Sequence, residues 1–310
     1  MSNPPSLTQS PRPNKDPLLE GVPAGGGRSL ASSPNSLLSV RNLSLEFRTR
    51  TGTVRALENI SFYINQGETI GIVGESGSGK SVLALAVMGI LDSAACITSG
   101  EILWQQQSNT YDLLQASQKT LRQLRGKSLS MIFQTPRTAL NPIRKVGKQI
   151  VDVLRCHTDL PRAQLKPKAL QLLASVKIPD PQQRYNAYPY ELSGGLCQRI
   201  LIALAIACSP NLLIAAEPTT GLDVTTQATV MNLLKDLAPE QQTEQQMATV
   251  LITHDLALAS EYCDRILVMN AGHLIETEPT SPKIDNPTNP NTTTTTSATN
   301  NNSNRDERTR

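Results

Sequence analysis

The stretch of sequence that decides the fold is Gly74-Glu75-Ser76-Gly77-Ser78-Gly79-Lys80-Ser81, which matches the pattern G-x-x-x-x-G-K-S. Residues 69–73, directly before it, form the apolar run TIGIV and predict a buried strand. Residues 82–88, directly after it, form an apolar run that predicts a helix. Because the motif is meaningful only between a strand and a helix, this context predicts a phosphate-binding loop rather than a glycine-rich turn with a surface lysine.

The residue types of this loop indicate what it binds. Glycines allow the backbone to curl so that successive N–H groups point at a polyphosphate, and the following helix adds the positive end of its dipole. Lys80 would reach the β- and γ-phosphates, and the hydroxyl group of Ser81 would ligate Mg²⁺. The sequence therefore predicts a site for a nucleoside triphosphate and Mg²⁺.

Composition and charge narrow the classes of protein that fit. The 310 residues are enough for one large domain or two modest ones, and the formal net charge of +3 is too small to indicate nucleic acid as a partner. The five cysteines form no C-x-x-C pair and no zinc-binding spacing, which is typical of a reducing cytoplasm. No apolar segment typical of a secretory signal stands at the N-terminus.

The most membrane-like stretch is residues 200–216, which carry no charge. It contains Ser-Pro-Asn and is shorter than the roughly 20 residues that a membrane span needs. This stretch therefore predicts a buried helix, a turn and a buried strand. We expect a soluble cytoplasmic protein that a partner can hold against a membrane.

The chain divides into three parts by composition. Residues 1–36 are rich in Pro, Ser and Gly and predict a disordered leader, and residues 279–310 form a Thr/Asn-rich tail that we also expect to be disordered. Alternating apolar residues at 38–47 and at 54–64 predict two antiparallel strands. We expect one folded domain over residues 37–278.

A helical block, residues 136–192, interrupts the strands. Two apolar faces are predicted in it, one with Ile143, Val146, Ile150 and Leu154, the other with Leu165, Ala169, Leu172 and Val176. Short apolar runs predict strands at 102–104, 129–134, 212–216 and 249–253 and a closing hairpin at 265–276. Nearly continuous apolar strands favour a parallel sheet that is covered on both faces. The predicted fold class is α/β, with an antiparallel β subdomain and an inserted α-helical subdomain.

Four further motifs follow the phosphate loop in a fixed order. They are Gln134 at the end of a predicted strand, Leu192-Ser193-Gly194-Gly195 after the helical block, Glu217-Pro218-Thr219-Thr220-Gly221-Leu222-Asp223 after a buried strand, and His254 after the next one. Together with the phosphate loop, this set resembles the ATP-binding subunit of ABC transporters, and the resemblance covers residues 37–278. It implies a P-loop NTPase sheet and ATP as the nucleotide.

Within that family, the chain is most similar to the importers of oligopeptides, dipeptides and nickel. The stretches that carry this likeness are MIFQTPRTALNP at 131–142, YPYELSGGLCQR at 188–199 and EPTTGLDVTTQ at 217–227. The tail keeps an eroded NPTNPNT at 286–292, whereas the cysteine-bearing extension of some members of this branch is missing.

The resemblance implies roles for the residues of the motifs. Glu217 would orient and deprotonate the attacking water, and His254 would contact the γ-phosphate. Gln134 would sense Mg²⁺ and the γ-phosphate, so Ser81 and Gln134 are the expected metal ligands. The alternative interpretations are a carboxylate that caps a turn for Glu217 and a structural side chain for His254 and for Gln134.

The remaining predicted residues concern a second subunit and the adenine base. Ser193, Gly194 and Gly195 open a helix, and by resemblance their N–H groups face the ATP of the opposite subunit. Asp223 would lie at the contact between the two subunits. Phe47 is the candidate for stacking on adenine, with a core aromatic residue in an edge strand as the alternative interpretation.

One residue departs from the family pattern. The strand before Glu217 should end in Asp-Glu, but here it ends in Ala216-Glu217, so one carboxylate that helps to hold Mg²⁺ is missing. Loss of an outer metal partner typically costs roughly 10- to 100-fold in affinity or activity. Two outcomes are open. Either this subunit hydrolyses ATP slowly, or it only binds ATP and its Ser-Gly-Gly turn completes a competent site on a different partner.

The leading hypothesis is the energising subunit of an importer for peptides or a related small solute, nickel included. Its expected partners are a second ABC ATPase subunit, identical or not, two transmembrane permease subunits and, indirectly, an external solute-binding protein. Its expected place is the cytoplasmic face of the inner membrane. Two other classes stay open: a non-catalytic, nucleotide-dependent assembly subunit, and a soluble ABC protein of repair or translation. The single cassette and the importer-like stretch at 131–142 disfavour the last of these.

Overall fold

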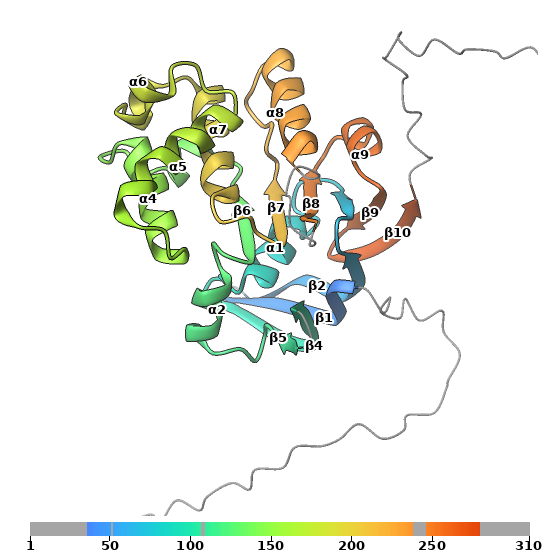
Figure 1. Ribbon diagram of the computed structural model, residues 1–310. Coiled ribbons are helices and arrows are strands. Elements are labelled where there is room, and N and C mark those ends of the chain that lie inside the picture. The colour runs from blue at the N-terminus through green and yellow to red at the C-terminus, as the bar shows by residue number, and fades with distance from the viewer. Residues whose placement is uncertain (1–35, 51, 107–108, 238–245, 280–310) are drawn as a thin grey trace, which may run out of the picture. The chain divides into compact units, whose positions relative to one another are not determined.

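The computed structural model describes residues 36–50, 52–106, 109–237 and 246–279. The predicted leader, apart from Ser36, and the predicted tail, apart from Pro279, lie outside the described residues. Figure 1 shows the arrangement of the helices and strands.

Four strands form an antiparallel sheet in the order β2-β1-β4-β5. They are β1 (Ser36–Thr49), β2 (Gly52–Asn65), β4 (Ala95–Gln106) and β5 (Asn109–Asp112). The two predicted alternating runs lie in β1 and β2, and the short run at 102–104 lies in β4, where Trp104 is fully buried. This sheet is the predicted antiparallel β subdomain.

Six strands form the second sheet, in the order β10-β9-β3-β8-β7-β6. They are β3 (Thr69–Val73), β6 (Leu129–Ile132), β7 (Leu212–Ala216), β8 (Ala248–Thr253), β9 (Arg265–Asn270) and β10 (His273–Pro279). Only the β9–β10 hairpin is antiparallel; the other neighbours pair in parallel. Strands β7 and β8 are buried along their whole length, as strands covered on both faces must be.

Along the chain, the helices lie between the strands. They are α1 (Lys80–Met88), α2 (Gln118–Leu124), α3 (Pro136–Ala139), α4 (Val146–His157), α5 (Arg162–Ser175), α6 (Pro181–Tyr185), the 3-10 helix η1 (Pro189–Glu191), α7 (Gly194–Ile206), α8 (Val224–Leu237) and α9 (Leu256–Tyr262). No helix among the described residues is both long enough and apolar enough to cross a bilayer. The stretch 200–216 is the end of α7, a turn and β7, as its composition predicts.

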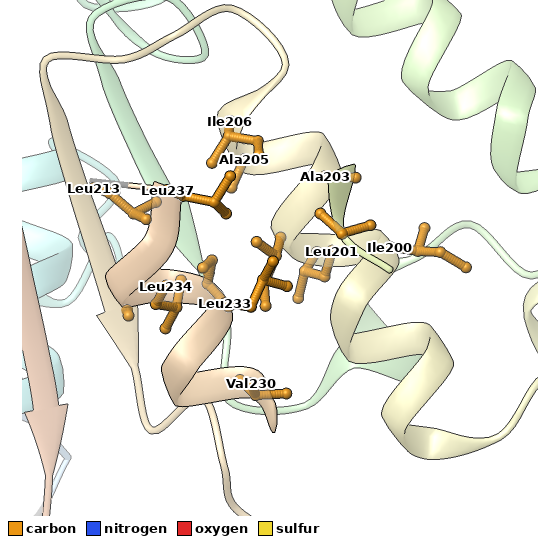
Figure 2. Packing of buried hydrophobic residues seen from close by; sticks show 14 of the residues in the cluster. Ile200, Leu201, Ala203, Ala205, Ile206, Leu213, Val230, Leu233, Leu234 and Leu237 are labelled. Carbon is orange, nitrogen blue, oxygen red and sulfur yellow. The ribbon is translucent and has the colours of Figure 1, made fainter. Parts of the chain in front are cut away.

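Alternate residues of the buried strands face two different cores. Leu213 of β7 belongs to the core that α7 and α8 build, whereas Ile214 belongs to the core shared with α1 and the antiparallel sheet. Figure 2 shows the first of these, with Leu201 of α7 and Leu233 of α8 facing each other beside the sheet. The two cores hold β7 from both sides and so fix the position of its carboxyl end.

The helical block differs from the prediction at its start. Val146, Ile150 and Leu154 are fully buried on one face of α4, as predicted, but Ile143 is 85% exposed and lies before the helix. The side chain of Asn141 accepts a hydrogen bond from the backbone N–H of Ile143 at 3.1 Å, and Pro142 stands between them. Such a local turn competes with a helix, so the predicted apolar face begins only at Val146. With this correction, the predicted fold class is confirmed.

Candidate nucleotide site

The carboxyl ends of four neighbouring parallel strands bring the predicted motifs to one edge of the sheet. Gly74 follows β3, Glu217 follows β7 and His254 follows β8. The predicted strand 129–134 ends at Ile132, so Gln134 lies in the loop after β6 rather than in the strand. Ligands of open α/β sheets bind outside the carboxyl ends of the strands, which makes this edge the candidate site.

The loop 74–79 curls around the ammonium group of Lys80. Lys80 Nζ donates hydrogen bonds to the carbonyl oxygens of Gly74 and Glu75, both at 2.7 Å, and lies 3.3 Å from Ser78 Oγ. Burial lowers the pKa of Lys80, and the negative charge of Glu217 opposes this shift. The loop, the start of α1 and the ammonium group together form the cradle that a polyphosphate requires.

Two glycines of this loop are required by the strands around it. A Cβ atom at Gly74 would lie 2.1 Å from the carbonyl oxygen of Met269 in β9. Gly79 has a φ of +102°, and a Cβ atom there would lie 2.7 Å from the carbonyl oxygen of Ala56 in β2. Because both obstacles are backbone atoms, no side-chain movement relieves them. Glycine is therefore needed at these positions for the loop to fit between β9 and β2.

The three predicted catalytic residues lie together around the carboxylate of Glu217. Gln134 Nε2 donates a hydrogen bond to Glu217 Oε2 at 2.6 Å, and His254 Nδ1 lies 3.9 Å from the same oxygen, an ion pair when the imidazole is protonated. The Glu217 side chain is 21% exposed, whereas that of His254 is 68% exposed. The carboxylate is thus partly shielded from water, and a hydrogen-bond donor and an imidazole lie beside it.

The backbone at Glu217 has an unusual conformation. Its φ is +46°, in the left-handed region that side-chain-bearing residues seldom adopt. Its N–H group donates to the carbonyl oxygen of Ile252 in β8 at 2.9 Å, and its own carbonyl oxygen accepts from the N–H group of Thr220 at 3.2 Å. These two bonds hold a conformation of the kind that costs about 1–3 kcal/mol and that clusters at functional sites.

Sequence reasoning did not single out Thr220, although the structure places it in this group. Its hydroxyl group donates a hydrogen bond to Glu217 Oε2 at 2.9 Å. A hydroxyl-bearing residue three positions after a strand-end carboxylate is the signal that could have indicated it, since a turn brings these positions together.

The available metal donors are few. No group of three or more His, Cys, Asp or Glu side chains in the described ranges could hold a metal ion. Ser81 is exposed in the first turn of α1, and Gln134 carries an amide oxygen, so both can offer the oxygen ligands that Mg²⁺ prefers. Ala216 is buried at the end of β7 and adds no donor. The residues present fit Mg²⁺ only if phosphates and water supply most of its ligands.

The Ser-Gly-Gly turn opens α7. Ser193 Oγ accepts a hydrogen bond from the N–H group of Leu196 at 3.3 Å, which makes Ser193 the N-cap of this helix. A Cβ atom at Gly194 would meet no atom closer than 3.9 Å, whereas one at Gly195 would lie 2.7 Å from Thr226 Cγ2. No hydrogen bond or ion pair of the described residues joins this turn to Lys80 or Glu217, and its role toward the ATP of another subunit stays a prediction.

Asp223 lies beside that turn. Its carboxylate accepts hydrogen bonds from Thr226 Oγ1 at 2.7 Å and from the Thr226 N–H group at 3.0 Å, and these bonds lower the pKa of Asp223. Thr226 is also the residue that a Cβ atom at Gly195 would strike. Asp223 and the Ser-Gly-Gly turn therefore form one surface.

Phe47 is half-buried in β1, paired with Val54 of β2 and Ala95 of β4. β1 is an inner strand, which corrects the edge strand of the alternative interpretation. The ring lies against the core of the antiparallel sheet. Stacking of Phe47 on adenine stays a prediction.

A comparison with protein-family models decides the assignment of the chain. The model described as ABC transporter matches residues 57–220. The chain belongs to the ABC transporter family. Its matched region begins in β2 and ends at Thr220, so it contains the phosphate loop, Gln134, the Ser-Gly-Gly turn and Glu217.

Curated relatives of this ABC chain are transport ATP-binding proteins. It is 48% identical over 241 residues to the dipeptide transport ATP-binding protein DppD of Haemophilus influenzae, covering 78% of this chain and 71% of the relative. It is 44% identical over 257 residues to the oligopeptide transport ATP-binding protein OppD of Bacillus subtilis, covering 83% and 70%. Among solved structures, a dimeric post-hydrolysis state of the ATP-binding cassette MJ0796 bound to ADP and Pi matches with a TM-score of 0.68 and 25% identity, covering 79% of this chain and 99% of that one.

Proposed function

We propose that this ABC chain binds and hydrolyses ATP to energise an importer of peptides or of a related small solute. The observation that carries the proposal is the pairing of the Lys80 cradle with the Glu217 carboxylate at one edge of the sheet. The substrate class comes from the names of the relatives, which transport dipeptides and oligopeptides. Substrate selection itself belongs to other subunits, so nickel and other small solutes stay open.

Hydrolysis at this site is mainly positioning and charge neutralisation. Lys80 and the loop N–H groups would hold the β- and γ-phosphates, while His254 would face the γ-phosphate. Mg²⁺, on Ser81 and Gln134, would supply positive charge to the phosphate oxygens. Glu217 would orient the attacking water and accept its proton.

The complete site requires a second ABC subunit. The Ser-Gly-Gly turn carries N–H groups at the start of α7, and Asp223 lies beside it, and no hydrogen bond or ion pair among the described residues joins either of them to the Lys80 cradle. In a head-to-tail pair, each turn would cover the ATP of the other subunit. We expect this pair to associate with two permease subunits at the cytoplasmic face of the inner membrane, with a solute-binding protein on the other side.

Of the two outcomes left open by Ala216, the geometry favours slow hydrolysis. Glu217 keeps its contacts with Gln134 and His254 although its neighbour carries no carboxylate. An ATP-binding subunit without hydrolysis is the second candidate, and Ala216 is the observation that favours it.

The proposal is tested by ATP hydrolysis and by nucleotide binding of the full chain. Glu217→Gln should lower the single-turnover rate at least about 100-fold and leave ATP binding intact, because it removes the base and keeps the cradle. Lys80→Ala should weaken ATP binding roughly 10- to 100-fold, since it removes charged hydrogen bonds to phosphate. Lys148→Ala, on the exposed face of α4, is the control and should change neither. Unaltered ATP affinity in Lys80→Ala would refute the assignment.

A further inference from the structure

The carboxylate of Glu217 is held from one side only. Gln134 Nε2, Thr220 Oγ1 and His254 Nδ1 all face Oε2, at 2.6, 2.9 and 3.9 Å. Within the described part of the chain, none of the hydrogen bonds or ion pairs involves Oε1. The two oxygens of this carboxylate therefore have different surroundings.

The three groups around Oε2 differ in how firmly they are fixed. Gln134 is in a loop and, under the proposed function, must turn its amide oxygen toward Mg²⁺. His254 is largely exposed and is charged only when protonated. Thr220, in contrast, is tied to Glu217 twice, through its hydroxyl group and through its N–H group, which donates to the Glu217 carbonyl oxygen at 3.2 Å. Of the three, only Thr220 can keep its hold while Gln134 and His254 act on the nucleotide.

We propose that Thr220 is a positioning residue that holds Glu217 through Oε2 and leaves Oε1 as the oxygen that accepts the water proton. The inference rests on the proposed function and goes one step beyond it. In the step, the water oxygen forms a bond to the γ-phosphorus and its proton passes to Oε1. The bond between the γ-phosphorus and the bridging oxygen breaks, and that oxygen leaves on ADP.

The missing carboxylate at position 216 makes this role more important in this chain. The family pattern places an Asp there, whose charge and hydrogen bonds would add to the fixed groups around the site. With Ala216, the orientation of Glu217 depends on its own turn, and the Glu217 φ of +46° shows how tightly that turn is bent. The hydroxyl group of Thr220 lies in the same turn and can therefore hold the Glu217 carboxylate in one orientation.

The test compares Thr220→Val with Thr220→Ser and with Thr219→Val. Valine has the shape of threonine but no hydroxyl group, so Thr220→Val removes the hydrogen bond with little change in volume. Serine restores the hydroxyl group. Thr219, the residue before Thr220, is the matched control. Its carbonyl oxygen accepts a hydrogen bond, but its side chain makes none of the hydrogen bonds found among the described residues.

The measurement is single-turnover hydrolysis of radiolabelled ATP by the full chain, which can detect slow hydrolysis. ATP binding is measured in parallel. Thr220→Val should lower the rate constant roughly 10- to 100-fold, the range of a lost hydrogen bond to a charged group, and should change the ATP Kd by less than about 2-fold. Thr220→Ser should recover the rate to within about 3-fold. Thr219→Val should match the parent.

Three outcomes would overturn the inference. Thr220→Val could hydrolyse ATP as fast as Thr219→Val does, Thr220→Ser could stay as slow as Thr220→Val, or Thr220→Val could lose rate and ATP affinity in equal measure, as a merely structural turn residue would. The single variant Glu217→Gln, measured beside Thr220→Val, separates the inference from the proposed function. If Glu217→Gln alone keeps the parental rate, the proposed base is wrong; if it abolishes the rate while Thr220→Val does nothing, only the role of Thr220 fails.

Discussion

At position 216, a methyl group stands where the family pattern places a carboxylate. Ala216 is buried at the end of β7, paired with Ile252 of β8, and directly precedes Glu217. By the family resemblance, a carboxylate at this point would help Ser81 to hold Mg²⁺ and its water. Compared with the family pattern, Ala216 therefore leaves the proposed metal site with one carboxylate fewer.

Restoring that carboxylate should raise the rate of hydrolysis. We expect Ala216→Asp to increase Mg²⁺-dependent ATP turnover roughly 10-fold or more, because outer metal partners contribute about 10- to 100-fold. Ala216→Asn is the matched control: it has the same size and an oxygen but no charge, and its gain should be smaller. Turnover is measured on the chain with its transporter partners across a Mg²⁺ titration. An equal rate in parent and Ala216→Asp at every Mg²⁺ concentration would rule out a metal defect at this position.

At the scale of elements, α4 and α6 meet at a glycine. A Cβ atom at Gly147 in α4 would lie 2.1 to 2.4 Å from ring atoms of Tyr185 in α6, and Tyr185 is itself buried. Helix propensity alone favours alanine over glycine by about 1 kcal/mol, whereas overpacking a core costs typically about 1–3 kcal/mol. The cost of the clash should exceed the gain in helix propensity, because the buried ring of Tyr185 has no free space to move into.

We therefore expect Gly147→Ala to lower the free energy of unfolding by about 1–2 kcal/mol, as measured by denaturant titration. Lys148→Ala, exposed on the same helix, isolates the effect of propensity and should be neutral or slightly stabilising. Adding Tyr185→Leu to Gly147→Ala should recover part of the loss, since a smaller side chain makes room. A Gly147→Ala variant as stable as the parent would show that α6 moves aside freely.

The elements also show which features a sequence can predict. The strands at 69–73 and 212–216 match β3 and β7 residue for residue, because strands buried on both faces are continuously apolar and end at glycine or at a charge. The seven-residue helix α9 was not predicted: it buries only Ala259 and is set by the cap that Asp255 makes with the N–H group of Leu258. So short an element carries too few apolar residues to show a period.

Part of the candidate site, too, could be predicted from the sequence, and part could not. The resemblance of their motifs to the ABC family was enough to predict that Gln134, Glu217 and His254 belong to one site, and the structure places their side chains together. Their meeting on one oxygen, and the addition of Thr220, depend on a left-handed φ at Glu217. No residue pattern predicts a left-handed φ at a glutamate, so the contacts at Glu217 Oε2 could come only from the structure.

At the scale of the whole molecule, the proposed nucleotide site has two groups of residues. One is the Lys80 cradle with Glu217, and the other is the Ser-Gly-Gly turn with Asp223, in which Thr226 contacts both the turn and Asp223. No hydrogen bond or ion pair among the described residues joins the two groups, and in the proposed head-to-tail pair a phosphate held by the first would meet the second on another molecule. ATP should therefore bind two subunits together, and hydrolysis should release them.

The expected behaviour is ATP-dependent association. With Glu217→Gln to prevent hydrolysis, Mg²⁺-ATP should shift the chain from monomer to dimer in size-exclusion chromatography with light scattering, and ADP should not. Ser193→Arg should abolish the shift, because it places a bulky cation at the N-terminus of α7, where the phosphate and the helix dipole must meet. Ser117→Arg, which alters a serine N-cap of the same kind on α2, is the control and should leave the dimer intact.

If the chain dimerises only when a second, non-identical ABC subunit is added, the pair is heteromeric. Its competent site would then combine this chain's Ser193 turn with a partner that has kept both carboxylates. A dimer that survives Ser193→Arg would place the contact elsewhere and exclude the head-to-tail arrangement.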